Sequence, residues 1–448
     1  MTEFLPGNLG PDELRRLNQT FPARYPFLLQ STARGGELGR FDILFAFPED
    51  SLVLDGKRLS GRCAESNTRF LDALDAWWNE EKTTVAANDL PFHGGWFLYL
   101  GYELAAEVEP SLTLHDDPLL PTAFAVRCPA AIILDHQTKD CVFVCEHDGD
   151  DLRQILMDDT NRLADEKARA ATSQFDVVED DPARYTDAVK RAKKYIEAGD
   201  VYQANLSRQW TVTIGDERSS ESIYASLCDA NPGPFAGLAR WQDTSIISSS
   251  PERLISVRDG IISTRPIAGT RRRGDDEVAD DDLSSELFAH PKERAEHIML
   301  IDLERNDLGR VCEAGTVEVD EMMVLESYAH VHHIVSNVRG KLRDDVTPGM
   351  AISAVFPGGT ITGCPKVRCM EIIDELEFAS RGAYTGSFGY LNRDGSLDLN
   401  ILIRTMVKRD HQISFRAGAG IVADSDPYAE LDEARAKAEG MLRALENA

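Results

Sequence analysis

Two Asp-Gly dipeptides set between apolar runs constrain the fold of this chain most. Asp259-Gly260 lies between the runs 254–257 and 261–264, and Asp394-Gly395 lies between two further apolar runs. A two-residue Asp-Gly loop favours a tight β-hairpin, because both residues tolerate a positive φ. Hairpins of this kind, separated from helical segments, predict an α+β fold rather than a doubly wound parallel sheet.

Changes in composition divide the chain into three parts. Residues 1–147 contain short apolar runs separated by Gly and Pro, which predict a β-rich N-terminal region. Residues 148–181 are expected to form an acidic linker and a polar helix. Residues 182–448 alternate hairpins and helices, including a turn at 409–411 that leads into a third antiparallel strand, and we expect them to form a catalytic domain.

The charge balance limits the choice of partners. The chain carries 76 Asp and Glu against 48 Lys and Arg, a formal net charge of −28. Such a field repels nucleic acids and anionic membrane surfaces, so neither is expected as a partner. An anionic substrate would need a local basic pocket, which draws attention to Arg404, Lys366 and Lys437.

Other bulk features predict a reduced, cytoplasmic enzyme. No apolar run reaches the roughly 18 residues of a membrane span, and no basic region followed by an apolar one opens the chain. The eight cysteines are scattered and form no Cys-x-x-Cys pair. Structural thiols are therefore expected rather than metal ligands.

Residues 356–368, Phe-Pro-Gly-Gly-Thr-Ile-Thr-Gly-Cys-Pro-Lys-Val-Arg, form the most distinctive motif. The glycines let a ligand approach the main chain, and a helix expected from about Met370 offers N–H groups to an anion. The alternative is an ordinary turn from a loop into a helix.

This motif resembles the signature of the chorismate-utilising enzymes, and the resemblance extends from about Tyr185 to the C-terminus. The segments 357–359 and 331–336 are more similar to the aminodeoxychorismate synthases within that family. The resemblance implies a large two-sheet antiparallel β-sandwich flanked by helices. It also implies Mg²⁺-dependent amination of chorismate to 4-amino-4-deoxychorismate, a step toward 4-aminobenzoate and folate.

Ammonia would come from a separate subunit. The chain has no glutaminase motif of the Gly-x-Cys-x-Gly type, since neither Cys63 nor Cys364 has the required flanking glycines. The resemblance therefore implies a glutamine amidotransferase partner.

Two predicted helices each carry a pair of glutamates three residues apart, Glu293/Glu296 and Glu430/Glu433. Residues at this spacing share one helix face. Taken alone, each pair could equally belong to a solvent-exposed acidic helix face, and Glu433 could instead form an ion pair with Lys437. The resemblance implies that Glu296 and Glu433 bind Mg²⁺ directly, while Glu293 and Glu430 hold its water shell.

Glu252 directly precedes the hairpin at Asp259-Gly260. Pairing about that turn places it roughly opposite Ile267 and beside Ala268, within a register error of one or two residues. The resemblance assigns a general acid to Glu252, a role that needs a raised pKa. The alternative is an exposed carboxylate at the start of a strand.

Ala268 departs from the pattern. Many aminodeoxychorismate synthases have a nucleophilic lysine at this position, whereas anthranilate synthases usually have alanine. Ala268 thus favours amination at C2, while the segments 202–205 and 331–336 favour amination at C4. Gln203 stands where isochorismate and salicylate synthases use a lysine to activate water, and glutamine cannot act as that base.

The resemblance also implies a substrate pocket. Each residue of this pocket could instead have a structural role, in an ion pair, a packed strand or a bulge. The implied residues are Thr270, His333, Thr360, Tyr384, Arg404, Gly418, Gly420 and Lys437.

A second site is implied by the segment 26–31, which resembles the tryptophan-binding segment of the family. Gln30 replaces its usual glutamate, so strong feedback regulation is not expected. The alternative for this segment is an ordinary strand edge. For the whole chain, the alternative is a catalytically silent tryptophan-sensing subunit, but Glu252 and the two glutamate pairs argue against it. The implied tryptophan-binding residues are Ser31, Leu38, Arg40, Phe41, Pro234, Phe235 and Ala236.

Overall fold

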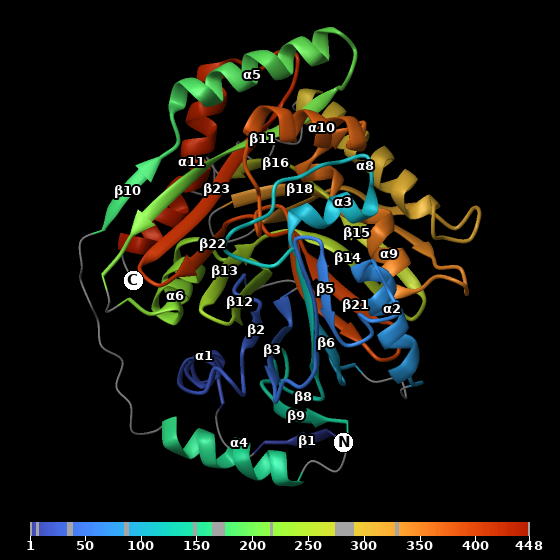
Figure 1. Cartoon of the computed structure of the whole chain (residues 1–448), viewed down its shortest axis with the longest axis vertical. Helices are drawn as coiled ribbons and strands as arrows, with labels where there is room; N and C mark the ends of the chain where they lie inside the picture. Colours follow the sequence, from blue (N-terminus) through green and yellow to red (C-terminus); the bar gives the residue numbers. More distant parts are fainter. Residues whose placement is uncertain are drawn as a thin grey trace.

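A computed structural model describes residues 2–5, 9–33, 39–84, 89–146, 150–163, 175–215, 218–273, 291–327 and 331–446. Every pair of neighbouring strands in this part of the chain is antiparallel. The strands form two large sheets with helices on the outside (Figure 1). The predicted α+β sandwich is therefore confirmed.

The first sheet mixes strands from both ends of the chain. Its order is β1-β9-β8-β3-β2-β12-β13-β22-β23-β11-β10, and β19 also pairs with β11. The bounds are β1 Thr2–Phe4, β2 Phe27–Gln30, β3 Phe41–Ala46, β8 Ala130–Asp135, β9 Cys141–Cys145, β10 Asp176–Glu179, β11 Gln203–Thr213, β12 Phe235–Trp241, β13 Thr244–Ser250, β19 Gly363–Cys364, β22 Thr405–Arg409 and β23 Gln412–Ile421.

The second sheet is also mixed. Its order is β16-β18-β15-β14-β21-β20-β6-β7-β4-β5, and β17 also pairs with β18. The bounds are β4 Ser51–Asp55, β5 Arg58–Gly61, β6 Gly95–Leu100, β7 Ala123–Cys128, β14 Arg253–Arg258, β15 Ile261–Arg265, β16 Ile267–Arg272, β17 Glu318–Ser327, β18 Val331–Lys341, β20 Ser387–Asn392 and β21 Leu397–Asn400.

An aromatic core joins the two sheets. Phe27 of β2 stacks on Phe97 of β6, with ring centroids 4.0 Å apart, and Phe124 of β7 stacks on Trp241 of β12 at 4.2 Å. Both pairs connect a strand of one sheet to a strand of the other. Stacked rings of this size bury much apolar surface, and they fix the sheets face to face.

Helices cover the outer faces of the sandwich. The residues of α1, α4, α5, α6, α10 and α11 pack on the first sheet, and those of α2, α8 and α9 pack on the second (Figure 1). The bounds are α1 Pro11–Thr20, α2 Phe70–Glu81, η2 Tyr102–Leu104, α3 Ala105–Val108, α4 Asp150–Leu163, α5 Pro182–Glu197, α6 Ser220–Ala230, α8 Pro291–Gly309, α9 Pro348–Val355, η3 Gly359–Ile361, α10 Lys366–Glu377 and α11 Pro427–Glu446.

The predicted hairpins are present, with two corrections. Asp259 and Gly260 both have positive φ and join β14 to β15 as expected. The loop between β20 and β21 spans four residues instead of two, and the Asp394 carboxylate accepts the N–H of Ser396 at 2.9 Å. The expected third strand of that group, β23, pairs with β22 and lies in the other sheet.

The boundary predicted at residue 147 does not separate two domains, because both sheets contain strands from each side of it. β6 pairs with β20, and β2 pairs with β12, so N-terminal and C-terminal strands share both sheets. Residues 176–179, within the predicted linker, form β10 at the edge of the first sheet. In the described part of the chain, no helix is long and apolar enough to cross a membrane.

Candidate active site

Glu252 lies in the connection between β13 and β14 and is only 4% exposed. Burial raises the pKa of its carboxyl to about 8. Approaches by the Thr360 hydroxyl and the Ile267 N–H offset part of this rise, and the nearby Glu304 carboxyl adds to it. Because a buried carboxyl of this kind keeps its proton at neutral pH, Glu252 can donate that proton to a reacting group.

The position of the Glu252 carboxyl follows from the end of the β14–β15 ladder, which contains a register shift. The β14–β15 ladder runs from Arg258↔Ile261 to Arg253↔Arg265, with a bulge between, and it ends before Pro266. The last pair, Arg253↔Arg265, puts the register one residue from the predicted pairing of 252 with 267, within its stated error, but the ladder stops there and β16 pairs with β18 instead. The predicted proximity holds through the side chain, since the Ile267 N–H donates to Glu252 Oε1 at 3.3 Å.

The signature motif turns tightly past Glu252 and docks on β11. Thr360 lies in η3, and β19 then pairs with Gln203 and Ala204. A Cβ on Gly363, which has φ +131°, would lie 2.2 Å from the Gln203 carbonyl oxygen, so only glycine fits this approach. The following helix begins at Lys366, one turn earlier than predicted.

Lys366 is not free to bind a substrate anion. Its ammonium pairs with the buried carboxylate of Asp307 and donates to the Val355 carbonyl at 3.0 Å. Its expected contribution to a basic pocket is therefore not supported.

Arg404 is a mostly buried cation at the point where the chain crosses from one sheet to the other. It has φ +53°, and burial lowers the pKa of its guanidinium. Among the described residues no carboxylate is paired with it. The nearby His333 is 2% exposed, and burial together with the Arg404 charge lowers its pKa to about 3, so it is neutral. An uncompensated buried guanidinium is well suited to bind a carboxylate.

Gly418 and Gly420 face β11 at close range. They pair with Ser207 and Asn205, and an added Cβ would lie 2.0 Å from the Leu206 carbonyl oxygen or 2.2 Å from Gln203 Nε2. The structure thus explains both glycines by strand packing. Binding of a substrate carboxylate by their main chain stays a prediction.

Lys437 and Glu433 form the ion pair that their spacing allows. The distance between Lys437 Nζ and Glu433 Oε1 is 2.8 Å, and the same ammonium donates to the Gly418 carbonyl at 3.0 Å. Both side chains are about half exposed, at 47% and 52%. Either group can exchange this surface partner for a ligand at little cost.

Tyr384 is 8% exposed and lies beside a buried charge cluster. The Arg381 guanidinium sits 5.6 Å from the centre of its ring, and Glu377 pairs with both Arg381 and Arg416. Burial raises the pKa of the Tyr384 phenol to about 12, so it remains a neutral donor.

The four proposed metal ligands lie on two helices. Glu296 belongs to α8, while Glu430 and Glu433 belong to α11, where Glu430 is 9% exposed. The side chain of Glu293 lies outside the described part. Within that part, no three His, Cys, Asp or Glu side chains gather into a metal-binding group. The carboxylate oxygens suit Mg²⁺ chemically, but their convergence stays a prediction.

For Ala268 and Thr270, the structure describes the position of the backbone only. They pair with Ile334 and His333 across β16 and β18, and their side chains lie outside the described part. This register brings the position of the missing lysine next to the strand that carries His333.

Sequence reasoning missed Glu304, whose charge acts on Glu252, and Asp307, which pairs with Lys366. Both are buried on α8, at 6% and 1% exposure. They fall on the same stripe as the buried Leu300, Ile301 and Leu308. Carboxylates at helical spacing on an apolar stripe are the signal that could have found them.

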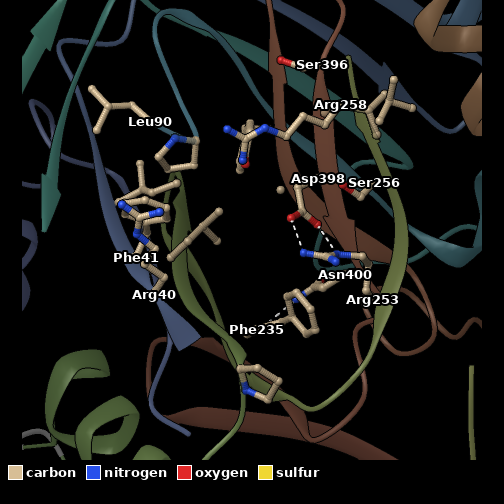
Figure 2. A pocket seen from close by; sticks show the side chains of 18 of the residues that line it. Arg40, Phe41, Leu90, Phe235, Arg253, Ser256, Arg258, Ser396, Asp398 and Asn400 are labelled. Carbon is tan, nitrogen blue, oxygen red and sulfur yellow. Dashed lines mark hydrogen bonds and ion pairs between the residues drawn. The ribbon is translucent and has the colours of Figure 1, made fainter. Parts of the chain in front are cut away.

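A second cavity of about 440 Å³ lies between the sheets (Figure 2). Five of the residues predicted to bind tryptophan line it. Ser31 is adjacent, and its hydroxyl donates to the Pro234 carbonyl at 3.1 Å, whereas Leu38 lies outside the described residues. The lining members of the predicted set are Arg40, Phe41, Pro234, Phe235 and Ala236.

The charged groups of this cavity are already paired. Arg253 donates twice to Asp398, at 2.9 and 2.7 Å, as Figure 2 shows, and Arg40 pairs with Asp135 at 2.8 Å. The aromatic rings of Phe41 and Phe235 supply apolar walls. The arrangement suits a mainly aromatic ligand with a few polar groups.

Comparison with known proteins identifies the family of this chain. The model of the chorismate binding enzyme family matches residues 25–443. The chain is 45% identical over 361 residues to an anthranilate synthase component I-like protein of Synechocystis sp., covering 80% of this chain and 74% of the relative. It is 39% identical over 387 residues to aminodeoxychorismate synthase component 1 of Bacillus subtilis, covering 84% and 82%.

A solved structure gives the same result. Anthranilate synthase component I from Streptococcus pneumoniae superposes with a TM-score of 0.80 at 30% identity, covering 91% of this chain and 93% of that one. Together with the family match over most of the sequence, this shows that the chain belongs to the chorismate-binding enzymes and is a chorismate-utilising enzyme.

Proposed function

We propose that this enzyme aminates chorismate at C4 to form 4-amino-4-deoxychorismate, in the cytoplasmic route to 4-aminobenzoate and folate. The observation that carries the proposal is the buried Glu252 carboxyl, whose pKa of about 8 keeps it protonated at neutral pH. Loss of the C4 hydroxyl of chorismate requires such a donor, because hydroxide is a poor leaving group and water is a good one.

The remaining groups bind the substrate around this donor. Arg404 binds a carboxylate of chorismate, which pairs with a guanidinium that has no carboxylate partner among the described residues. Neutral His333 and the Tyr384 phenol contact the ring and its side chain. Thr270, Thr360 and the main chain at Gly418 and Gly420 complete the pocket, with Lys437 at its edge.

Mg²⁺ is part of the proposal. Glu296 and Glu433 would hold the ion, with Glu293 and Glu430 around its water shell. When bound, the ion would grip a carboxylate of chorismate and offset its charge. Removing Mg²⁺ with a chelator should abolish turnover, and adding it back in excess should restore the rate.

Ala268 requires a route without a covalent lysine adduct. We propose that ammonia or water adds at C2 as the C4–O bond breaks and Glu252 protonates the departing oxygen. Ammonia then adds at C4 and expels the C2 substituent, so that chorismate and ammonia give the amino product and water. Mass spectrometry of enzyme trapped during turnover should show the unmodified chain mass; an adduct would overturn this route.

A second candidate is anthranilate synthase component I. The alanine at 268 favours it, because that reaction needs ammonia only at C2, followed by loss of pyruvate. Relatives of both names match the chain closely.

One product assay separates the two. The protein is incubated with chorismate, ammonium and Mg²⁺, and the products are separated by chromatography. The proposal predicts 4-amino-4-deoxychorismate without pyruvate. Fluorescent anthranilate with an equal amount of pyruvate would establish the second candidate instead.

A glutamine amidotransferase subunit would supply ammonia inside the cell. The names of the relatives, which end in "component 1", are consistent with such a partner. Addition of that subunit should let glutamine replace ammonium; if glutamine stays inert, the partnership is wrong.

We also propose that the second cavity binds tryptophan. Its aromatic walls fit an indole ring, and its fixed Arg253–Asp398 and Arg40–Asp135 pairs add a polar frame around an amino acid. Titration calorimetry with L-tryptophan tests this, and L-alanine is the matched control.

A further inference from the structure

The guanidinium of Arg381 uses all five of its N–H donors inside the protein. Arg381 lies in the connection between α10 and β20 and is 4% exposed. Its Nε donates to Glu377 Oε2 at 3.1 Å, and its Nη2 donates to Glu377 Oε1 at 2.6 Å and to the Asn205 carbonyl at 2.7 Å. Its Nη1 donates to the Ile361 carbonyl at 3.2 Å and to the Thr385 hydroxyl at 3.3 Å. No donor is therefore left for a substrate.

Two of these contacts reach segments that carry residues of the proposed pocket. Ile361 directly follows Thr360 in η3, within the signature motif. Asn205 lies on β11, where it pairs with Gly420 of β23. One side chain thus links the signature motif to the strand pair β11–β23.

The third segment is the turn that carries Tyr384. The Arg381 guanidinium lies 5.6 Å from the centre of the Tyr384 ring, and it donates to Thr385, the next residue, which has φ +63°. The carboxyl of Glu103 fixes the start of this turn, because it accepts the N–H of Arg381 at 2.7 Å and that of Gly382 at 3.1 Å. The turn is therefore held through both the side chain and the main chain of Arg381.

The contact with Glu377 alone would make Arg381 an ordinary member of a buried ion pair. Burial raises the pKa of Glu377, but the guanidiniums of Arg381 and Arg416 hold it below its ordinary value, so this carboxyl is ionised. Arg416 already supplies one cation, since it donates to Glu377 Oε2 at 2.8 Å. A second buried guanidinium is not needed to neutralise one carboxylate, and its other contacts point to a further role.

We propose that Arg381 is a positioning residue for the chorismate pocket, which holds the signature motif, the Tyr384 turn and the β11–β23 pair in the arrangement that binds substrate. It does not touch the substrate itself. The inference rests on the proposed function, which places Thr360, Tyr384 and Gly420 around chorismate. Displacement of such groups by about 1 Å is enough to cost about 10²-fold in rate.

The test compares two lysine substitutions that weaken the same buried ion pair. Arg381→Lys keeps a cation beside Glu377, but a single ammonium cannot reach the other acceptors of the planar guanidinium together. Arg416→Lys is the matched control. In the described part of the chain, the Arg416 guanidinium donates to Glu377 and to the hydroxyl and carbonyl of Ser207, at 3.0 and 3.4 Å for the latter two, and to neither the signature motif nor the Tyr384 turn.

The first readout is the steady-state rate of chorismate consumption, measured where circular dichroism shows folded protein. Arg381→Lys should raise KM for chorismate by about tenfold and lower kcat by about tenfold, because the pocket no longer holds the substrate against Glu252. Arg416→Lys should leave both constants within about twofold of wild type, although urea unfolding should show that both variants lose stability. A purely structural role would leave KM and kcat per folded molecule unchanged in both variants.

The second readout is hydrogen exchange followed by mass spectrometry, which needs no substrate. Peptides that cover 356–363 and 383–386 should exchange faster in Arg381→Lys and at the wild-type rate in Arg416→Lys. If Arg381→Lys does not fold, Arg381→Gln takes its place, because Glu377 then still pairs with Arg416. It should show the same changes in KM, kcat and exchange.

The outcomes separate this inference from the proposed function. Unchanged KM and kcat in the Arg381 variant overturn the positioning role, and so does an equal change in the Arg416 variant or unchanged exchange of the two segments. Because chorismate consumption is measured whichever amino product forms, an error in the C4 assignment leaves the test intact. If wild type consumes no chorismate, the proposed function falls and the positioning role falls with it.

Discussion

Glu252 and Arg253 are consecutive residues whose side chains lie at two different sites, the candidate active site and the cavity between the sheets. Glu252 turns into the candidate active site, where no cation is paired with its carboxyl in the described part of the chain. Arg253 turns the other way, into the cavity between the sheets, and donates twice to Asp398. The alternation of side chains along an extended segment separates them.

The difference shows how charge marks the two kinds of site. In the candidate active site, burial keeps Glu252 neutral and Arg404 has no carboxylate partner in the described part, so both are available to a ligand. In the second cavity, Arg253 and Arg40 are neutralised within the protein. Unpaired buried groups are costly and are kept where chemistry needs them, while paired groups provide a fixed frame.

The largest expected effect is that of Glu252→Gln. Turnover of chorismate should fall by about 10³-fold, because the amide cannot protonate the leaving hydroxyl. The variant should stay folded, with an unchanged circular dichroism spectrum. Retention of a tenth or more of the wild-type rate would remove the functional distinction between the two sites.

The next effect is that of Arg404→Lys. The cation is kept but the two-pronged contact with a carboxylate is lost, so kcat/KM for chorismate should fall by about 10²-fold. Steady-state kinetics measure this, and Lys408→Arg on the neighbouring strand β22 is the matched control. Unchanged kinetics would mean that Arg404 does not bind the substrate.

Arg253→Met should act on stability and leave the kinetics of chorismate nearly unchanged. Asp398 would lose its partner in a cavity where burial already raises its pKa, which costs about 2 kcal/mol of unfolding free energy. Urea unfolding measures the loss. Arg62→Met, which breaks an exposed pair with Glu80, should cost less than about 0.5 kcal/mol. Equal losses in the two variants would contradict this reading.

The smallest expected effect on turnover is that of Phe235→Ala. It removes an aromatic wall of the second cavity, so affinity for tryptophan should fall about tenfold while the rate without tryptophan stays within about twofold. A large loss of rate in the absence of tryptophan would show that the second cavity and the candidate active site are coupled.

Local turn chemistry made part of the fold predictable. Asp259 and Gly260 favour positive φ by themselves, and they form the expected hairpin. The loop at Asp394 was predicted too short, because the side-chain contact with Ser396 competes with the tight turn. The strand at 412–421 was placed in the wrong group, because the crossing at Arg404 depends on contacts between distant parts of the chain.

The sequence suggested candidate site residues, but it could not predict their electrostatics. Family motifs pointed to Glu252 and to the lining of the second cavity. The pKa of Glu252 depends on burial by segments far away in sequence, and Arg40 pairs with Asp135, which is 95 residues away. Lys366 looked available in the sequence, but it is held by Asp307 from another helix. Long-range pairing of this kind leaves no local trace.

The central claim, that Glu252 is a buried proton donor, can be measured directly by infrared spectroscopy. The difference between wild type and Glu252→Gln should contain a protonated carboxyl band at pH 7 that disappears with a midpoint near pH 8, because burial raises the pKa to about 8. The rate of turnover should fall over the same range as pH rises. A band already lost below pH 5 would show an ordinary ionised carboxylate and would contradict the account.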